Sequence, residues 1–314
     1  MKSGAKIIMK NPIFADLSLL FITIIWGMTF VIVQDAINFL PPIAFNGIRF
    51  LLAAILLIIG LFIFERKQLK EINFKLIASG FLIGFWLFLG YITQTIGLLY
   101  TTTSKAGFIT GLSVILVPLF SLFFLKQVPS KNAILGVLTA TIGLFLLTMT
   151  DVTGLNIGDG FVFICAISFA FQIILTSKFS SKYPTLLLTV IQILTVAVLS
   201  VFFSICFEDW QKVLNPQLLF SKDIIIALVI TGVFATAVAF FVQTKFQKYT
   251  STTRVALIFT MEPVVAAITG FFWAHEHLSY SALFGCMLIF MGMIFAELPA
   301  GKIRMIRKSK SFEG

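Results

Sequence analysis

The sequence contains few charged residues and little metal-binding chemistry. Only 11% of its 314 residues are charged, and only two are histidines. Its three cysteines, Cys165, Cys206 and Cys286, stand at unmatched spacings inside apolar runs, and no CxxC pair is present. These absences argue against a disulfide framework and against a zinc site. They favour cysteines that pack as small buried apolar residues.

The composition is instead typical of a membrane-spanning protein. Hydrophobic residues make up 59% of the chain, 37 residues are phenylalanines, and the mean hydropathy is +1.05. An α-helical crossing of a bilayer takes about 20 predominantly apolar residues. Ten runs of about this length can be marked, so the sequence predicts an all-α integral membrane protein with ten transmembrane helices: Leu17–Val33, Ile43–Phe64, Phe74–Leu98, Ala106–Leu125, Ala133–Met149, Gly160–Leu175, Leu186–Phe207, Ile224–Thr244, Thr252–Trp273 and Ala282–Leu298.

The net charge of +10 is explained by orientation in the membrane and does not indicate nucleic-acid binding. With the N-terminus placed in the cytoplasm, 19 of the 23 Lys and Arg residues fall on that side. Only Lys105, Lys212 and Lys222 fall on the other side, and Arg49 lies inside a span. The positive-inside rule therefore predicts a multi-pass protein of the cell membrane with both termini, including a basic tail at 299–314, in the cytoplasm.

The chain also repeats itself. At an offset of 143 residues Asp16 matches Asp159 and Pro41 matches Pro184, and Arg49 meets Gln192. At an offset of 149 the matched pairs are Gln94 with Gln243, Thr95 with Thr244, Tyr100 with Tyr249, Lys105 with Arg254, Ser130 with Ser279, Gly136 with Gly285, and Gly143 with Gly292. Two units of five spans, 14–149 and 157–298, follow from these offsets. Because five is odd, the second unit must enter the membrane from the opposite side. Such an inverted repeat is typical of secondary transporters with a substrate site at mid-membrane.

The ninth predicted span, Thr252–Trp273, carries Glu262 at its midpoint, directly before Pro263. A charged residue at mid-helix costs roughly 2.5–3.5 kcal/mol on insertion scales. The proline removes a backbone donor and frees carbonyls that need other partners. Glu262 is therefore expected to face protein or water, where it could exchange protons, bind a cationic substrate group, or accept bonds from neighbouring helices.

Arg49 lies about two turns inside the second span and has two open interpretations. It could bind a substrate carboxylate or Glu262, or its long stem could snorkel to the interface.

Two aromatic–amide pairs occupy equivalent places in the third and eighth spans, Tyr91 with Gln94 and Phe240 with Gln243. At i, i+3 spacing each pair shares one helix face, which suits the wall of a substrate cavity. Glutamine also joins membrane helices to each other, so that alternative stays open. Further candidate lining residues are Trp26, Thr29, Asn46, Thr110, Ser113 and Gln172. The Ser and Thr hydroxyls among them could instead bond their own backbone. The GxxxG pairs Gly80/Gly84 and Gly107/Gly111 are expected to serve helix packing.

Several of these marks together resemble EamA-type carriers of the drug/metabolite transporter superfamily. They are Trp26-Gly27, the Arg49 of GIRFLLA, Glu262-Pro263, Glu276, and Gly285 with Gly292. The resemblance covers nearly the whole chain. It implies transport of small metabolites such as amino acids, with spans 1, 3, 4, 6, 8 and 9 around a central cavity.

The first half departs from the pattern. It has Ser113-Val114 in place of Glu262-Pro263, with Pro118 one turn later. Acid-dependent function is therefore expected from the second half alone.

The expected function is a secondary active transporter that moves a small organic metabolite, an amino acid or similar compound, by alternating access, with export as one possible direction. Proton coupling through Glu262 is a hypothesis. An uncoupled facilitator is the main alternative, and an intramembrane enzyme would need a catalytic cluster at one depth.

We expect no cofactor, and the chain has no Walker loop, which argues against ATP-driven transport by this chain alone. We expect no metal, because His275-Glu276-His277 offers no i, i+4 ligand pair. The expected partners are a small-molecule substrate and the lipid bilayer, without nucleic acid or an ATPase subunit. Monomer and homodimer are both open.

Overall fold

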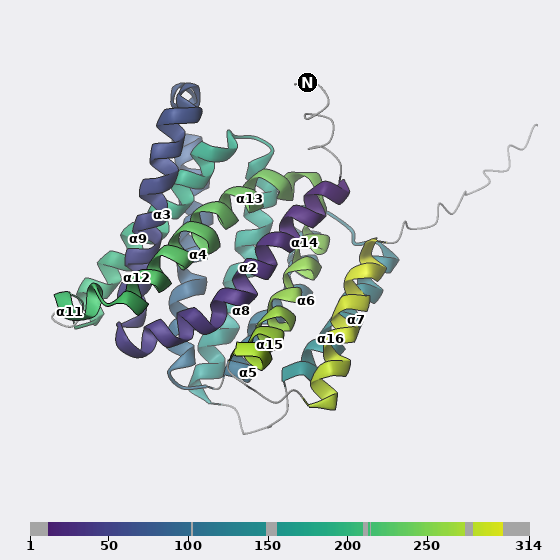
Figure 1. Cartoon of the computed structure of the whole chain (residues 1–314). Helices are drawn as coiled ribbons and strands as arrows, with labels where there is room; N and C mark the ends of the chain where they lie inside the picture. The colour runs from purple at the N-terminus through teal and green to yellow at the C-terminus, as the bar shows by residue number, and fades with distance from the viewer. Residues whose placement is uncertain are drawn as a thin grey trace, which may run out of the picture.

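The structure, a computed structural model, describes residues 12–101, 103–148, 156–209, 213, 215–273 and 279–297. Nine stretches in this part of the chain are long and apolar enough to cross a membrane, and Tyr280–Ala296 forms a shorter tenth (Figure 1). The predicted all-α membrane protein is confirmed. In chain order the helices are α2 (Pro12–Phe39), α3 (Pro42–Phe64), η1 (Arg66–Glu71), α4 (Phe74–Leu98), α5 (Thr103–Gly111), α6 (Ser113–Phe124), α7 (Lys131–Thr148), α8 (Ile157–Ser180), α9 (Thr185–Phe207), α11 (Pro216–Leu219), α12 (Lys222–Val229), η2 (Ile230–Val238), α13 (Ala239–Phe246), η3 (Gln247–Tyr249), α14 (Thr252–Phe259), α15 (Met261–Trp273) and α16 (Tyr280–Glu297).

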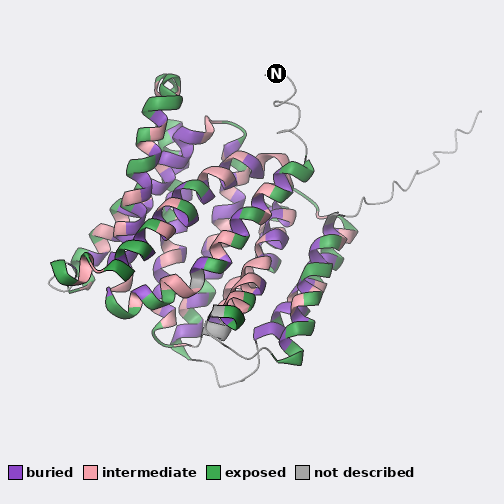
Figure 2. Ribbon diagram, viewed as in Figure 1, coloured by how far each residue is buried: buried purple, intermediate pink, exposed green. Residues whose placement is uncertain are grey.

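The outer surface is apolar, as contact with lipid requires. Large side chains that point outward include Phe62, Phe123, Phe202 and Phe272, each more than half exposed. Buried residues line the faces on which the helices meet each other (Figure 2). We call the end of the bundle where α2 begins the terminal face, and the other end the opposite face.

Equivalent helices of the two halves pack against each other reciprocally. Helix α3 crosses α9, and a side chain just beyond the C-terminal end of each caps the start of the other. Glu208 accepts bonds from the backbone N–H groups of Ile43 and Ala44 at 2.8 and 2.7 Å, and Gln68 accepts one from Leu187 at 3.1 Å. These side chains satisfy amide groups that a helix start leaves without partners.

The second reciprocal contact joins α7 to α16. A Cβ on Gly136 would lie 2.5 Å from the carbonyl oxygen of Gly292, and one on Gly143 would lie 2.6 Å from that of Gly285. The offset of 149 relates Gly136 to Gly285 and Gly143 to Gly292. The two glycine contacts are therefore equivalent to each other when the halves are exchanged. Only glycine allows the two backbones to approach this closely.

The fourth and ninth predicted spans are each interrupted near the middle of the membrane. The sequence did not indicate the interruption in the fourth span. The ninth span breaks at Thr260, three residues before Pro263, and the Thr260 hydroxyl donates to Leu257 O at 2.6 Å. The fourth span breaks at Leu112, whose N–H is shared between two carbonyls at 3.1 Å. Pro118 lies inside α6 and therefore does not cause the second break.

Two packing predictions were partly wrong. Gly80 and Gly84 contact α9 as expected, but a Cβ on Gly107 would meet nothing within 4 Å. Gly107 is instead beside the cavity described below. Cys165 is buried, whereas Cys206 is exposed on the outer face of α9, because that face is apolar and needs no burial. The tail 299–314 and His275-Glu276-His277 lie outside the described residues.

Replacing Gly143 with alanine is expected to destabilise the fold by roughly 1–3 kcal/mol. The added Cβ would meet a backbone oxygen that cannot rotate away. Gly60→Ala on α3 is the matched control, because its Cβ would meet nothing within 4 Å. Alanine there is expected to be neutral or slightly stabilising. Thermal unfolding in detergent measures both variants, and equal melting temperatures would contradict the close glycine packing.

Candidate functional site

A cavity of about 400 Å³ lies between the two halves. It extends from the middle of the bundle toward the opposite face, where its lining includes Leu98, Thr148 and Ser279 near the ends of their helices. All twelve residues that the sequence nominated for substrate binding line this one cavity: Trp26, Thr29, Asn46, Arg49, Tyr91, Gln94, Thr110, Ser113, Gln172, Phe240, Gln243 and Glu262. Their role in binding stays a prediction.

Aromatic pairs related by the repeat form part of the wall. Trp26 of α2 packs on Phe240 of α13, and Phe169 of α8 packs on Tyr91 of α4, both with ring centroids 5.6 Å apart. The offsets of 143 and 149 relate these two pairs to each other. The Trp26 indole is fixed further by a 2.8 Å hydrogen bond from Nε1 to the carbonyl oxygen of Ala235. Each pair joins a ring of one half to a ring of the other, so the wall has two equivalent aromatic surfaces on which an apolar part of a ligand could pack.

Arg49 is held inside the protein. Its side chain is 3% exposed, and Nε donates to the Thr236 hydroxyl at 2.7 Å. The guanidinium carbon lies 5.3 Å from the centre of the Tyr91 ring and 5.4 Å from that of Phe50. Of the two interpretations from the sequence, snorkelling to the interface is therefore wrong. Arg49 is instead part of the cavity wall and contributes a positive charge to it.

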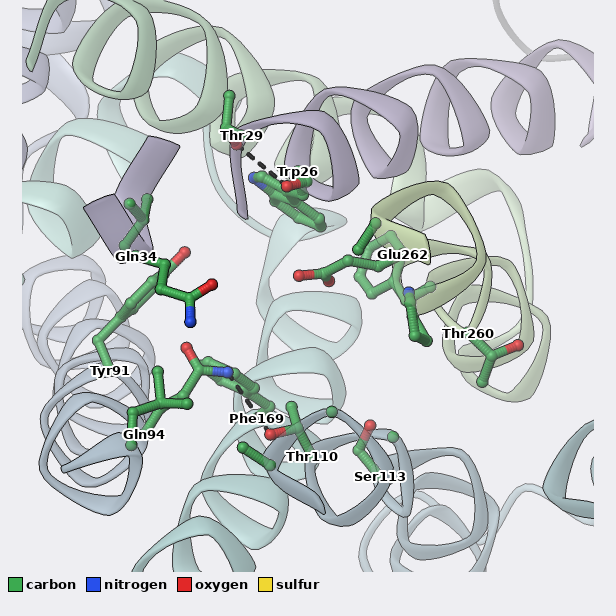
Figure 3. Close-up of a pocket in the computed structure, with 18 of the residues that line it drawn as sticks. Trp26, Thr29, Gln34, Tyr91, Gln94, Thr110, Ser113, Phe169, Thr260 and Glu262 are labelled. Atoms are coloured by element: carbon green, nitrogen blue, oxygen red, sulfur yellow. Dashed lines mark hydrogen bonds between the residues drawn. The ribbon is translucent and has the colours of Figure 1, made fainter. Parts of the chain in front are cut away.

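Glu262 is the first-turn acid of α15, directly after the break at Thr260. Helix α2 passes so close that a Cβ on Gly27 would lie 2.7 Å from the carbonyl oxygen of Glu262. The carboxylate points into the cavity (Figure 3). Within the described residues it has no hydrogen-bond donor and no ion-pair partner, although Arg49 is near enough to act on it electrostatically. The acid and the cation therefore face one space without neutralising each other directly.

Neutral polar groups complete the wall. Gln94 makes a long bond of 3.5 Å from Nε2 to the Thr110 hydroxyl, and the amides of Gln34 and Gln94 point toward the same space as Glu262 (Figure 3).

The two polar side-chain atoms of Asn46 are buried without a hydrogen-bond partner, one turn from Arg49 on α3. The hydroxyl of Thr29 bonds its own helix, at Ile25 O, as its alternative interpretation expected.

A network of amides ends the cavity toward the terminal face. Gln172 and Gln243 exchange two hydrogen bonds of 3.4 and 3.2 Å, and Gln243 also donates to Gln247 at 3.1 Å. Gln247 in turn donates to Ile173 O at 2.6 Å and to Ser177 at 2.8 Å. The interpretation of glutamine as a link between helices therefore holds for this pair, which forms the floor of the cavity.

Further contacts join the helices beside this floor and at the terminal face. Phe171 stacks between Phe120 and Trp86, with centroids 5.0 and 4.5 Å away. Asp16 of α2 forms an ion pair with Arg254 of α14 at 3.4 Å. At the opposite face the equivalent acid, Asp159, accepts a bond of 2.5 Å from Thr101. Each acid thus joins the first helix of one half to the entry of the fourth helix of the other.

Sequence reasoning missed two lining residues with visible signals. Phe169 stands three residues before Gln172, the same aromatic–amide spacing that identified the other two pairs. Gln34 lay just beyond the predicted end of the first span, but α2 continues to Phe39. Phe259 and Thr260 also line the cavity because the ninth span breaks there.

The chain is similar to known transporters over most of its length. Residues 13–149 and 156–297 each match the model of the EamA-like transporter family. A protein of Archaeoglobus fulgidus named "uncharacterized transporter" is 35% identical over 286 residues, which cover 91% of this chain and 86% of that protein. The transporter YoaV of Bacillus subtilis, also named "uncharacterized", is 26% identical over 288 residues, which cover 88% of this chain and 94% of YoaV.

One solved structure shares the fold, with a TM-score of 0.77 at 20% sequence identity. The match covers 91% of this chain and 97% of that chain. The two family matches, one on each half of an inverted helical repeat around a central polar cavity, establish what kind of molecule this is. The chain belongs to the EamA-like transporter family, within the drug/metabolite transporter superfamily, and is a multi-pass membrane transporter of a small molecule.

Proposed function

We propose that the protein is a secondary active transporter that carries a small zwitterionic metabolite, such as an amino acid, across the cell membrane by alternating access. The observation that carries this proposal is the pair of opposite charges in the cavity. Arg49 comes from the first half and Glu262 from the second, and both line the same space without an ion pair between them.

The charges favour a ligand that carries both signs. A carboxylate of the ligand would suit the guanidinium of Arg49, whose planar donors match carboxylate geometry. An ammonium group would suit the carboxylate of Glu262, with Ser113 and Thr110 nearby as neutral acceptors. The rings of Trp26 and Phe240 would cover an apolar side chain, as in other small-molecule sites.

The residues that line the cavity favour a state that is open at the opposite face only. It continues to the ends of the helices at the opposite face, whereas the amide network and the Asp16–Arg254 pair close the terminal face. With the termini in the cytoplasm, as the distribution of Lys and Arg indicates, this state is open to the outside. The inward-open state would exchange the roles of equivalent contacts in the two halves.

Proton coupling is part of the proposal, and it rests on Glu262 alone. No other acidic side chain lines the cavity among the described residues. Its counterpart in the first half is Ser113, so one half carries the titratable group. The lone acid also makes catalysis by paired carboxylates a poor alternative.

Glu262→Gln is expected to abolish the response of transport to a pH gradient, because glutamine cannot exchange a proton. A thermal-shift screen of metabolites first identifies a ligand, since any molecule that binds the folded state raises its stability. Uptake of that ligand into proteoliposomes is then measured with and without an imposed pH gradient.

Glu65→Gln is the matched control, because this acid is exposed beyond the end of α3 and is expected to leave the response intact. A pH response that survives in Glu262→Gln would overturn proton coupling. Uptake by the wild type that stops at equal concentrations on both sides would instead identify a facilitator.

Asp16→Asn is expected to open the cavity toward the terminal face more often, because it weakens the ion pair with Arg254. The reporter is Ser113→Cys in a variant whose native cysteines are replaced. Its reaction with an impermeant thiol reagent is measured from each side of sealed vesicles. We expect the rate from the cytoplasmic side to rise about fivefold, as a shift of roughly 1 kcal/mol would produce.

Asp35→Asn is the control that tests whether loss of another acidic side chain on α2 also raises the labelling rate. Asp35 is exposed near the opposite end of the same helix, so its loss is expected to leave the rate unchanged. Equal rates in Asp16→Asn and Asp35→Asn would show that the Asp16–Arg254 pair does not hold the terminal face closed.

A further inference from the structure

The eighth span contains a π-helical segment, η2 (Ile230–Val238), between two α-helical halves, α12 and α13. π-Helices are rare, usually a single turn, and frequent at functional sites. The equivalent residues of the first half, 81–89, lie inside the regular α-helix α4. The segment is therefore a feature of one half only, like Glu262.

The π geometry sets the orientation of one hydroxyl. Thr236 donates to the carbonyl oxygen of Thr231 at 2.8 Å, five residues earlier. Threonines in α-helices bond carbonyls three or four residues earlier, as Thr244 does with Phe240 at 2.8 Å. Because its one proton is used in this way, Thr236 is left with its oxygen lone pairs as an acceptor. Arg49 Nε donates to that oxygen at 2.7 Å.

Two side chains of the cavity are anchored on this segment. Besides Arg49, the indole of Trp26 bonds the carbonyl oxygen of Ala235 at 2.8 Å. The segment also packs tightly on the helix that carries Arg49, since a Cβ on Gly232 would lie 2.9 Å from Leu52 and 3.3 Å from Arg49 O. Both anchored residues line the cavity, whereas Thr236 does not.

We infer that Thr236 is a positioning residue that fixes the guanidinium of Arg49 as the carboxylate-recognising group of the cavity. The bond occupies Nε, so the terminal nitrogens, which also lie beside the Tyr91 side chain, are the groups that would meet a carboxylate in a bidentate arrangement. The inference rests on the proposed function, because it assigns the carboxylate of the substrate to Arg49.

The physical benefit is preorganisation. An arginine side chain has about 2 kcal/mol of rotamer entropy, and fixing it before the ligand arrives removes part of that cost from binding. The other half has a similar threonine bond but no charge. Gln192, which stands at the position equivalent to Arg49, bonds Thr244 at 2.9 Å and carries no charge.

The first test measures selectivity between two probes, L-phenylalanine and L-phenylalaninamide, which differ only in the carboxylate. We expect the wild type to prefer phenylalanine. In Thr236→Val, which keeps the shape and removes the hydroxyl, that preference should fall about tenfold while binding of the amide stays the same. Thr236→Ser keeps the acceptor and should restore the preference.

Thr231→Val is the matched control. Thr231 is equally buried on the same segment, but its hydroxyl bonds Ala227 O within its own helix. This variant is expected to keep the preference of the wild type. If Thr236→Val does not fold, Thr236→Ala takes its place with the same expectation.

A second measurement needs no ligand. In ¹⁵N-arginine-labelled protein, the Nε–H signal of Arg49 is identified by its loss in Arg49→Lys. Exchange of this proton with water should be slow in the wild type, Thr236→Ser and Thr231→Val, and fast in Thr236→Val.

The outcomes separate the two proposals. Slow exchange in Thr236→Val, or an unchanged preference for the carboxylate in that variant, overturns the positioning role of Thr236. If the wild type binds neither probe, the amino-acid assignment fails, and the exchange measurement alone then decides whether Thr236 fixes Arg49.

Discussion

A cation and an acid lie at mid-depth in a bundle whose outer surface is apolar, and they are not paired with each other. Placing either charge there costs several kcal/mol unless the protein or water compensates for it. The surrounding structure provides that compensation through the cavity. Arg49 is fixed by a hydroxyl and flanked by two rings, and Glu262 is turned into the hollow between the halves. The cavity therefore lowers the free-energy cost of placing Arg49 and Glu262 inside the membrane.

The two halves share their framework but not their chemistry. Equivalent aromatic pairs, equivalent glycine contacts and equivalent acids at the two faces recur on both sides of the pseudo-symmetry. Such a framework can reach two mirror-related states at similar energy, which alternating access requires. The charged groups break the symmetry, because Ser113 and Gln192 stand where Glu262 and Arg49 stand in the other half. In the proposed mechanism, both halves therefore take part in the movement, and recognition of the substrate depends on single residues from each.

Much of this could be predicted from the sequence. Polar residues in apolar spans are expensive to expose to lipid, so they gather in the cavity, and the twelve nominated residues do so. The break at Leu112, the π-helical segment and the open space beside Gly107 could not be predicted. They depend on how neighbouring helices satisfy local backbone and packing, as at Gly232 against α3, which hydropathy does not report. Gln34 was missed because hydropathy ends a span where α2 continues as a helix.

We propose that the carboxylate of Glu262 links binding of the substrate to binding of a proton. Isothermal titration calorimetry of one ligand, performed at a single pH in buffers with different ionisation enthalpies, counts the protons exchanged for each ligand bound. We predict a measurable exchange in the wild type and none in Glu262→Gln. The same proton count in both proteins would show that Glu262 does not link substrate binding to proton binding.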